Sequence, residues 1–453
     1  MSSTLILQGA TLGENKPPPM PKNPLVKLQG KSGGQVTSFG LDADMLSKHT
    51  LLVGGTGCGK SNLFYHFVKQ LKANMSDSDI MIIFDSKGDF HEKFPPAKND
   101  VIIGNSPQYR KNSERWNIFR EVLADGWDDV VINTQEICKA FFEERVSSNS
   151  SNPFFPNAAR DVLASIIISL IRHGRLSDKA QTEAYAKLFW RNDFLKKIID
   201  ESPPEELVDM TQSSGQDLRK VKTYIGGRGS KQAEGVLAEM YSVADDIFRG
   251  IFAENGKFSI RDFVRKKGGR TLYIEYDLSN GSILGPIYTI LFDLALKEAM
   301  GRQVQPGTKP PNVFFIVDEL KLLPRLQHID DGINFGRSLG VKIFAGLQSI
   351  EQLYANYEEA DAKNIIAGFS SIYTFRANDP RTREYARDLF GENFVLERYQ
   401  GTDRMLKDTV PHTGHTVEDW DLRRLEVGEA VVGLPGKDKP LEPFRFLFEL
   451  YRG

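Results

Sequence analysis

The sequence predicts an α/β fold in which helices flank a largely parallel sheet and an all-α domain is inserted into the chain. Three observations predict this class. A strand, a glycine-rich loop and a helix follow one another in LLVGGTGCGKSNLF (Leu51–Phe64). A second apolar strand ends in paired acids in NVFFIVDEL (Asn312–Leu320). Between these two segments lies a long stretch whose apolar residues recur at helical spacing.

Length and charge limit the possible functions. The 453 residues suffice for two or three domains at roughly 150 residues each. A formal net charge of −2 excludes a basic field over the whole chain, so any contact with DNA has to use local patches. The two cysteines, Cys58 and Cys138, provide neither a disulfide framework nor a metal site, and they indicate a cytoplasmic location.

No segment of the sequence predicts a membrane span. The longest apolar stretches, Val162–Ile171 and Ile283–Leu296, are shorter than the roughly 20 residues that a membrane helix needs. The first residues, MSSTLILQGATLGENK, lack the basic start and long apolar centre of a signal peptide. We therefore expect a soluble chain without a transmembrane segment of its own.

The glycine-rich loop has the P-loop pattern of Gly54, four residues, then Gly59, Lys60 and Ser61. Glycines let successive backbone N–H groups and the helix N-terminus converge on phosphate oxygens. Lys60 is expected to reach the β and γ phosphates, and Ser61 to ligate Mg²⁺. A glycine-rich turn without a ligand is the alternative, but the strand and helix on either side favour nucleotide binding. The predicted nucleotide-binding residues are Gly54, Gly55, Thr56, Gly57, Cys58, Gly59, Lys60, Ser61 and Asn62.

The acidic pair after the second strand matches a Walker B motif. Asp318 is expected to hold Mg²⁺ through water, and Glu319 to orient and polarise the attacking water. The alternative is a buried strand that ends in a solvated acidic pair. Lys60 and Asp318 lie 258 positions apart, which is too far for a compact nucleotide kinase or a small GTPase.

Further strands are predicted from buried apolar runs, and the last two segments indicate a β-hairpin. The predicted strand segments are Asp79–Phe90, Asp100–Asn105, Thr271–Leu278, Val341–Ser349, Ser371–Asn378, Gly428–Gly436 and Pro443–Tyr451. Residues 119–250 contain amphipathic helical patterns such as FFPNAARDVLASIIISLIRHG and few strand-like runs. The prolines of KPPPMPKNP predict an extended arm near the N-terminus.

Seven segments, taken together and in order, resemble one protein family. They are HTLLVGGTGCGKS, FDSKGDF, RWNIF, FFPNAARDVL, GKFSIRDFV, FFIVDEL and GRSLGVKIFAGLQSIEQL. In this order the chain resembles the type IV secretion coupling proteins of the TraD and TrwB kind, within the FtsK/HerA superfamily of hexameric DNA-pumping ATPases. The P-loop alone is generic, whereas its combination with FDSKGDF and GRS…GLQS is far more specific. The resemblance extends from about Val36 to Gly433.

The resemblance implies a RecA-like motor with an inserted all-α domain, assembled as a homohexameric ring with nucleotide between subunits. The expected organisation is an arm at 1–30, the motor at 31–118 and 251–433, the inserted domain at 119–250 and a C-terminal strand segment at 434–453. Beside Lys60 and Glu319, Gln348 matches a glutamine that senses the γ-phosphate. Arg337 matches an arginine that reaches a neighbour's nucleotide, and the alternative is that it pairs with a surface carboxylate. Asp85 and Lys87 match a motif beside the active site.

The implied function is an ATP-driven DNA translocase that delivers DNA or nucleoprotein to a conjugative or type IV secretion apparatus, with ATP and Mg²⁺ as cofactors. Its expected partners are DNA bound without sequence preference, and a relaxase or secretion-channel proteins. Arg228, Lys231 and the segment Arg265–Arg270 are candidates for basic contacts in the channel, and solvated turns are the alternative that is favoured for each. Coupling proteins usually begin with membrane helices, which this sequence lacks, so recruitment to the membrane by a partner is one expectation. Two alternatives remain: a soluble HerA-like ATPase partnered with a nuclease, and a recruitment platform whose helical domain binds protein.

Overall fold

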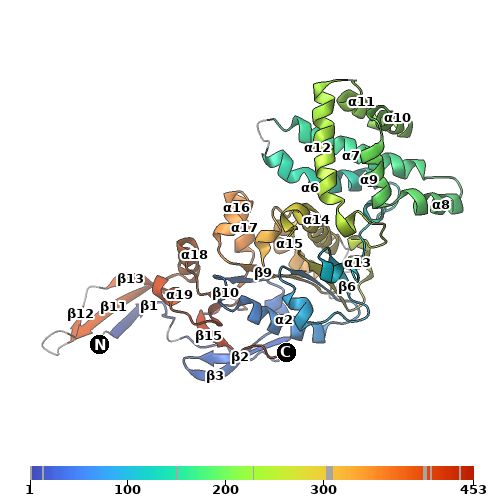
Figure 1. Cartoon of the computed structure of the whole chain (residues 1–453). Coiled ribbons are helices and arrows are strands. Elements are labelled where there is room, and N and C mark those ends of the chain that lie inside the picture. The colour runs from blue at the N-terminus through green and yellow to red at the C-terminus, as the bar shows by residue number, and fades with distance from the viewer. Residues whose placement is uncertain are drawn as a thin grey trace. The chain divides into compact units, whose positions relative to one another are not determined.

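The structure of the protein is a computed structural model that describes residues 3–12, 15–148, 152–227, 229–301, 310–400, 406–408, 411–437 and 440–453 (Figure 1). The chain divides into two compact units. Unit 1 comprises Met1–Asn99, Gly268–Thr271 and Ala299–Gly453, and unit 2 comprises Asp100–Lys267 and Leu272–Glu298.

Unit 1 is built on a mixed sheet. Its strands are β2 (Val26–Ser32), β3 (Gln35–Leu41), β4 (Thr50–Val53), β5 (Ile80–Asp85), β8 (Val313–Val317), β9 (Val341–Leu347), β10 (Ser371–Phe375), β14 (Glu429–Gly433) and β15 (Phe444–Phe448). They follow the order β3-β2-β15-β14-β10-β4-β9-β8-β5. The neighbours from β10 to β5 run parallel, and those from β3 to β10 run antiparallel. Strands β4, β5, β8 and β9 are buried along their whole lengths, which explains why each is a nearly unbroken apolar run.

A second, smaller sheet in unit 1 was not predicted. It contains β1 (Ser3–Gln8), β11 (Glu392–Gln400), β12 (Leu406–Asp408) and β13 (His412–His415), and β1 and β13 both pair with β11 in antiparallel fashion. The predicted extended arm therefore contains one strand near its beginning and reaches a second one at Val26. The proline-rich stretch between the two strands has no regular structure.

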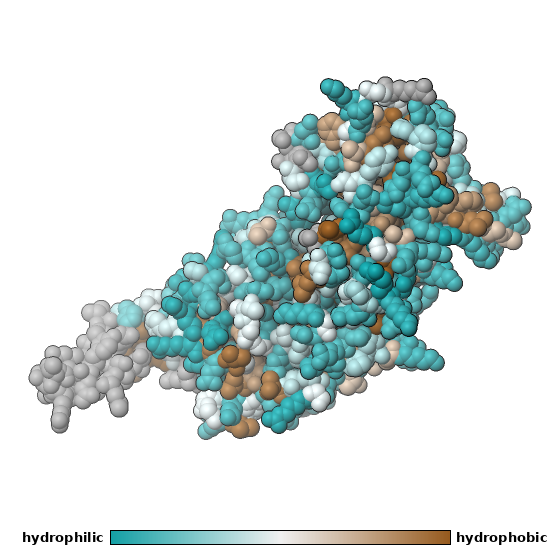
Figure 2. All heavy atoms as spheres, viewed as in Figure 1, coloured by the Kyte–Doolittle hydropathy of each residue, from teal (hydrophilic) through white to brown (hydrophobic). Residues whose placement is uncertain are grey.

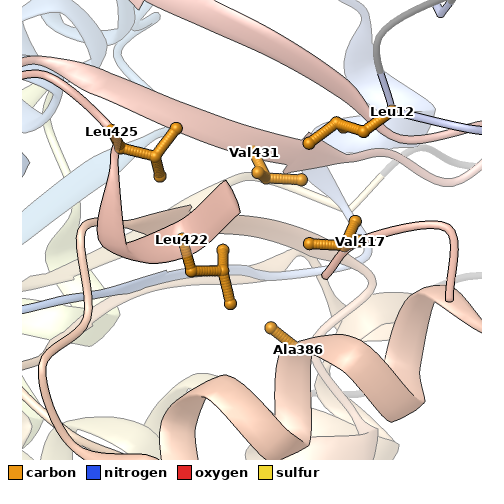
Figure 3. Packing of buried hydrophobic residues seen from close by; sticks show 6 residues of the cluster. All are labelled: Leu12, Ala386, Val417, Leu422, Leu425 and Val431. Carbon is orange, nitrogen blue, oxygen red and sulfur yellow. The ribbon is translucent and has the colours of Figure 1, made fainter. Parts of the chain in front are cut away.

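Helix α2 (Lys60–Asn74) packs on the centre of the main sheet. Its Leu63, Phe64, Phe67, Val68 and Leu71 are buried, and the Phe67 ring lies 5.2 Å from that of Phe344 and 5.9 Å from that of Tyr373. The other helices of unit 1 are α1 (Ala43–Leu46), α3 (Asp89–Lys93), η3 (Leu320–Leu322), α15 (Ile329–Asn334), η4 (Gly336–Leu339), α16 (Glu351–Asn356), α17 (Glu359–Ala367), α18 (Pro380–Phe390) and α19 (Asp419–Arg423). A buried cluster joins α18, α19 and β14 to the segment after β1: Leu12, Ala386, Val417, Leu422, Leu425 and Val431 (Figure 3).

Unit 2 is mainly helical. Its helices are α4 (Pro107–Arg110), α5 (Ile118–Val122), α6 (Val130–Ser148), α7 (Phe154–His173), α8 (Lys179–Phe189), α9 (Asn192–Glu201), α10 (Pro204–Ser214), η1 (Gln216–Leu218), α11 (Lys220–Ile225), α12 (Lys231–Ile247), η2 (Gly250–Phe252) and α13 (Ile260–Lys266). Unit 2 also contains the parallel strands β6 (Val101–Gly104) and β7 (Arg270–Glu275) and the helix α14 (Gly281–Met300). The first residues of β7 and the last residues of α14 belong to unit 1. Between β6 and β7 the described residues form helices and no strand.

Helix α7 is the core of the helical bundle, and α6, α10 and α12 pack against it. The full helix is longer than the apolar run Val162–Ile171, and by length and composition alone it is sufficient to cross a membrane. However, 72% of its apolar window is buried inside the structure, as expected for a core helix.

The predicted fold class is confirmed: unit 1 carries a P-loop on a parallel core flanked by helices, and the helical segment interrupts the sequence of that core. Every predicted strand segment contains a strand, and the C-terminal hairpin forms from β14 and β15. The exact domain boundaries stay a prediction.

Candidate nucleotide-binding site

The loop between β4 and α2 has the backbone of an anion site. Gly57 and Gly59 have φ angles of +73° and +110°, which favour glycine because a Cβ atom is strained there. At Gly59 space also requires glycine, since a Cβ atom would lie 2.8 Å from the backbone of Gly428. Helix α2 begins at Lys60 without a side-chain cap, so the first N–H groups of this long helix stay available for an anion.

Lys60 folds back over its own loop. Its Nζ donates hydrogen bonds to the carbonyl oxygens of Gly54 (2.5 Å) and Gly55 (3.2 Å). Burial lowers the pKa of Lys60 below its ordinary value, and the charge of Glu319 acts in the opposite direction. The ammonium group thus lies within the loop that would surround a bound phosphate.

The acidic pair lies at the carboxyl end of β8. Asp318 is buried, and its Oδ2 accepts a hydrogen bond of 2.8 Å from the Ser86 hydroxyl. Burial, followed by the charge of Asp85, raises the pKa of Asp318 to about 7. Oδ1 of Asp318 and Oε1 of Glu319 are buried and have no hydrogen-bond partner among the described residues. Two unsatisfied carboxylate oxygens are a suitable donor set for a hydrated Mg²⁺.

Gln348 connects the loop to the acidic pair. Its Nε2 donates to Oε2 of Glu319 at 2.7 Å, and its Oε1 accepts from the hydroxyl of Thr56 at 3.1 Å. Strand β9, which ends one residue earlier, lies between β4 and β8, so its end falls between the two motifs. The structure therefore brings Lys60, Asp318, Glu319 and Gln348 to one edge of the sheet.

The side chain of Asp85 holds a backbone turn beside this site. Its carboxylate accepts hydrogen bonds from the backbone N–H groups of Lys87, Gly88, Phe90 and His91, which closes the turn from β5 into α3. Burial nevertheless raises the pKa of this carboxyl. The side chain of Lys87 is exposed.

Arg337 is not joined to this group in the single chain. It lies in η4, and its guanidinium pairs with Asp44 of α1 at 2.8 Å. Both side chains are more than half exposed, at 51% and 57%. Among the described residues, the guanidinium of Arg337 has no hydrogen bond or ion pair with the loop or the acidic pair.

Asn62 and the candidate DNA contacts were also predicted to be functional residues. The side chain of Asn62 binds the backbone of the C-terminal segment, donating to Glu449 O at 3.0 Å and accepting from Tyr451 N at 2.7 Å. Among the candidate DNA contacts, Arg228 lies outside the described residues, Lys231 begins α12, and Arg265 pairs with Asp125 and Glu298.

A family described as the type IV secretion-system coupling protein DNA-binding domain matches residues 35–411. The chain belongs to this coupling-protein family. Among curated proteins, VirD4 of Rhizobium radiobacter is 22% identical to this coupling-family chain over 240 residues, which are 52% of the chain and 33% of VirD4. The match thus spans about a third of the length of the curated relatives.

Solved structures share the fold of this coupling-family chain. The plasmid coupling protein TrwB in complex with the ATP analogue ADPNP has a TM-score of 0.69 and 21% sequence identity, with 95% of each chain covered. TrwB in complex with ADP and Mg²⁺ has a TM-score of 0.68 and 22% identity, with 94% of this chain and 89% of TrwB covered.

Sequence reasoning missed two residues of the coupling-family site. Ser86 holds Asp318 in place, and Gly428 donates its N–H to Cys58 O at 2.9 Å behind the loop. Ser86 follows a strand-ending aspartate, and that position at the carboxyl edge of a parallel sheet was a usable signal. Gly428 begins a predicted strand segment, and nothing in the sequence places it beside Cys58.

Proposed function

We propose that this coupling-family chain is a Mg²⁺-dependent ATPase that uses hydrolysis to move DNA toward a conjugative or type IV secretion apparatus. The observation that carries the proposal is the side-chain bridge from Thr56 through Gln348 to Glu319. A side chain that contacts both the phosphate loop and the acid of the second motif is placed to respond to a γ-phosphate between them.

Different residues of the chain would bind the phosphates and orient the attacking water. Backbone N–H groups from Thr56 to Ser61 would bind the β-phosphate, and Lys60 would exchange its carbonyl partners for phosphate oxygens. Glu319, through its unsatisfied Oε1, would accept a hydrogen bond from the attacking water and orient it. Gln348 would hold Glu319 in the orientation needed for that contact.

Ser61 and the free Oδ1 of Asp318 fit a Mg²⁺ ion, the latter through water. The bound ion neutralises charge on the β and γ phosphates. Ser86 keeps the Asp318 carboxylate directed by occupying its other oxygen. The complexes of TrwB with ADPNP and with ADP and Mg²⁺ support ATP and Mg²⁺ as the cofactors of this related chain.

DNA as the moved substrate is supported by membership of the coupling-protein DNA-binding family. We further propose that the chain acts as a homohexameric ring, in which Arg337 completes the neighbouring site, and that secretion-channel proteins or a relaxase bring it to the inner face of the membrane. A ring would repeat each basic contact six times, so a chain with a net charge of −2 can still bind DNA phosphates locally.

The test is phosphate release by the purified chain with and without single- and double-stranded DNA of mixed sequence, combined with native mass measurement. The expected result is Mg²⁺-dependent turnover that DNA stimulates under conditions where oligomers form. Turnover that is indifferent to both forms of DNA would contradict translocation.

A further inference from the structure

Unit 2 contains an open cavity of about 470 Å³. Its walls come from four segments within this unit: Asn117–Ala124, which includes α5, the end of α8 with Trp190 and Arg191, the loop Asn255–Lys257, and Asp262 of α13. This volume is within the range of roughly 300–1,000 Å³ that is typical of ligand sites.

Hydrogen bonds hold the walls of the cavity in place. The side-chain Nδ2 of Asn117 donates to the carbonyl oxygens of Trp190 and Gly256, both at 3.0 Å. The indole N–H of Trp190 donates in turn to Leu170 O at 3.0 Å. Gly256 lies so close to Arg115 O that a Cβ atom would be only 2.0 Å away. The cavity is therefore formed before any ligand binds, which reduces the entropy lost on binding.

The rim of the cavity carries three exposed cations, Arg120, Lys187 and Lys257. None of them has an ion pair or a side-chain hydrogen bond among the described residues. The other charged groups at the cavity are compensated, because Arg191 pairs with Asp193, and Asp262 with Lys266. The rim thus has an excess of positive charge.

This positive rim lies in an acidic part of the chain. Unit 2, which contains the whole rim, has 26 Lys and Arg against 29 Asp and Glu, a formal net charge of −3. A long polyanion such as DNA would meet repulsion beyond the rim, whereas a short acidic segment would not.

Part of the cavity lining is apolar, since Phe119, Leu123, Ala186 and Trp190 contribute to it beside the polar and charged residues. Helix α8 beside it has no buried residue, and its Leu188 side chain is 58% exposed. Figure 2 shows hydrophobic residues at the surface in the region where Figure 1 labels α8. A ligand for this surface therefore needs both negative charge and an apolar side chain.

We propose that this cavity binds a short acidic segment of a partner protein, with an aromatic or aliphatic side chain inserted among Phe119, Leu123 and Trp190, and with carboxylates on Arg120, Lys187 and Lys257. The inference goes beyond the proposed function, because it concerns unit 2 and requires no nucleotide.

The test uses the full chain and a fluorescein-labelled peptide, Gly-Asp-Glu-Phe-Glu-Asp-Gly, with fluorescence anisotropy as the readout. Matched probes replace the four acids by Ser, replace Phe by Ser, or consist of an eight-nucleotide oligothymidylate. Arg120→Glu combined with Lys257→Glu should weaken peptide binding by about tenfold or more, because close interfacial charges contribute on this scale. Lys179→Glu, at the start of the same helix α8, serves as the charge-matched control and should change the affinity by less than about twofold.

Ala186→Trp tests the cavity itself, because it fills the space without changing a charge. This variant should also lose the peptide while keeping the thermal unfolding profile of the wild-type chain. If it misfolds, the charge reversals on exposed side chains still decide the question. Absence of peptide binding, equal binding of the Ser-for-acid probe, or tighter binding of the oligothymidylate with the same sensitivity to the variants would each overturn the proposal.

Discussion

Nε2 of Gln348 donates a hydrogen bond of 2.7 Å to Oε2 of Glu319, while Oε1 of the same glutamine accepts one of 3.1 Å from Thr56. One amide thus joins the phosphate loop to the acid that we assign to water activation. Because the two contacts use opposite ends of the amide, a substitution can break one of them and leave the other.

Gln348→Glu tests this link. The new carboxylate cannot donate to Glu319 and places a like charge beside it, so kcat should fall by about a hundredfold, the lower end of the range for general-base effects. Affinity for ADP should change little, because Lys60 and the backbone of the loop are intact. Glu351→Gln, a charge change on the helix that follows, is the control. An unchanged kcat in Gln348→Glu would remove the functional role of this bridge.

The two motifs predict different defects. Lys60→Ala should lose nucleotide affinity, because the buried ammonium is the loop's own cation. Glu319→Gln should bind ATP but not turn it over, since the amide cannot accept the proton of the attacking water. Binding of a fluorescent ATP analogue and phosphate release measure the two effects separately, and Lys72→Ala, further along α2, should retain both. Unimpaired turnover in Glu319→Gln would make that assignment wrong.

Substitutions of Arg337 and Asp44 can distinguish a catalytic role of Arg337 in a neighbouring subunit from a surface ion pair with Asp44. If the arginine acts in trans, Arg337→Ala should lose roughly a thousandfold in turnover, while Asp44→Asn keeps it. If the pair with Asp44 is its whole role, both variants should be equally active and differ from wild type by under about 1 kcal/mol in stability.

Mixing experiments extend the Arg337 test. Arg337→Ala chains combined with Lys60→Ala chains should recover activity, because each supplies what the other lacks at a shared interface. Mixed rings that stay as inactive as their components would contradict the trans role.

Stability should depend on pH through Glu121 in unit 2. This carboxyl is fully buried and accepts hydrogen bonds from Trp116 Nε1 (2.9 Å), Ser259 Oγ (3.0 Å), and the N–H groups of Ile260 and Arg261. Burial is the main cause that raises its pKa from 4.5 to about 7, although these donors oppose the shift. Below pH 4.5 the folded and unfolded states both carry the proton. Between pH 4.5 and 7 only the folded state retains it, so the free energy of unfolding should fall as pH rises through this window.

The size of this effect is on the order of 3 kcal/mol, and urea unfolding at pH 5 and pH 8 measures it. Glu121→Gln should reduce the dependence, and Asp318, whose pKa is also raised to about 7, accounts for a part that remains. The variant should also be less stable at both pH values, because its NH₂ group would face backbone and indole donors. Glu144→Gln, at an exposed position of α6, should keep the wild-type dependence. A Glu121→Gln chain that keeps the full wild-type dependence would contradict the prediction.

The sequence predicted the parallel core well because β4, β5, β8 and β9 are buried on both faces and must be apolar throughout. The same logic located Lys60, Asp318 and Glu319, whose chemistry requires a fixed position at the end of such a strand. The sequence was therefore sufficient to predict those positions where the local structure and the chemistry of the site require the same residue types.

Prediction failed where pairing depends on distant partners. Strand β1 is short, and its identity as a strand comes from β11, whose paired residue Arg398 lies 395 positions from Ser3. The hairpin of β2 and β3 had a usable signal, since Gly33 and Gly34 form its turn with φ angles of +55° and +80°. The surroundings of Arg337 could not be predicted, because Asp44 and Arg337 meet only through the folding of the whole sheet.

The hydrogen bond from Gly428 N to Cys58 O joins the phosphate loop to a residue 370 positions further along the chain. A ribosome that adds 5–20 residues per second needs on the order of 20–70 s to make that stretch of chain. During this interval the nascent chain contains the phosphate loop but not yet Gly428, whose backbone supports the loop from behind. Nascent chains should therefore gain nucleotide affinity late and abruptly, which would delay ATP-dependent assembly with neighbouring chains until synthesis of this region is complete.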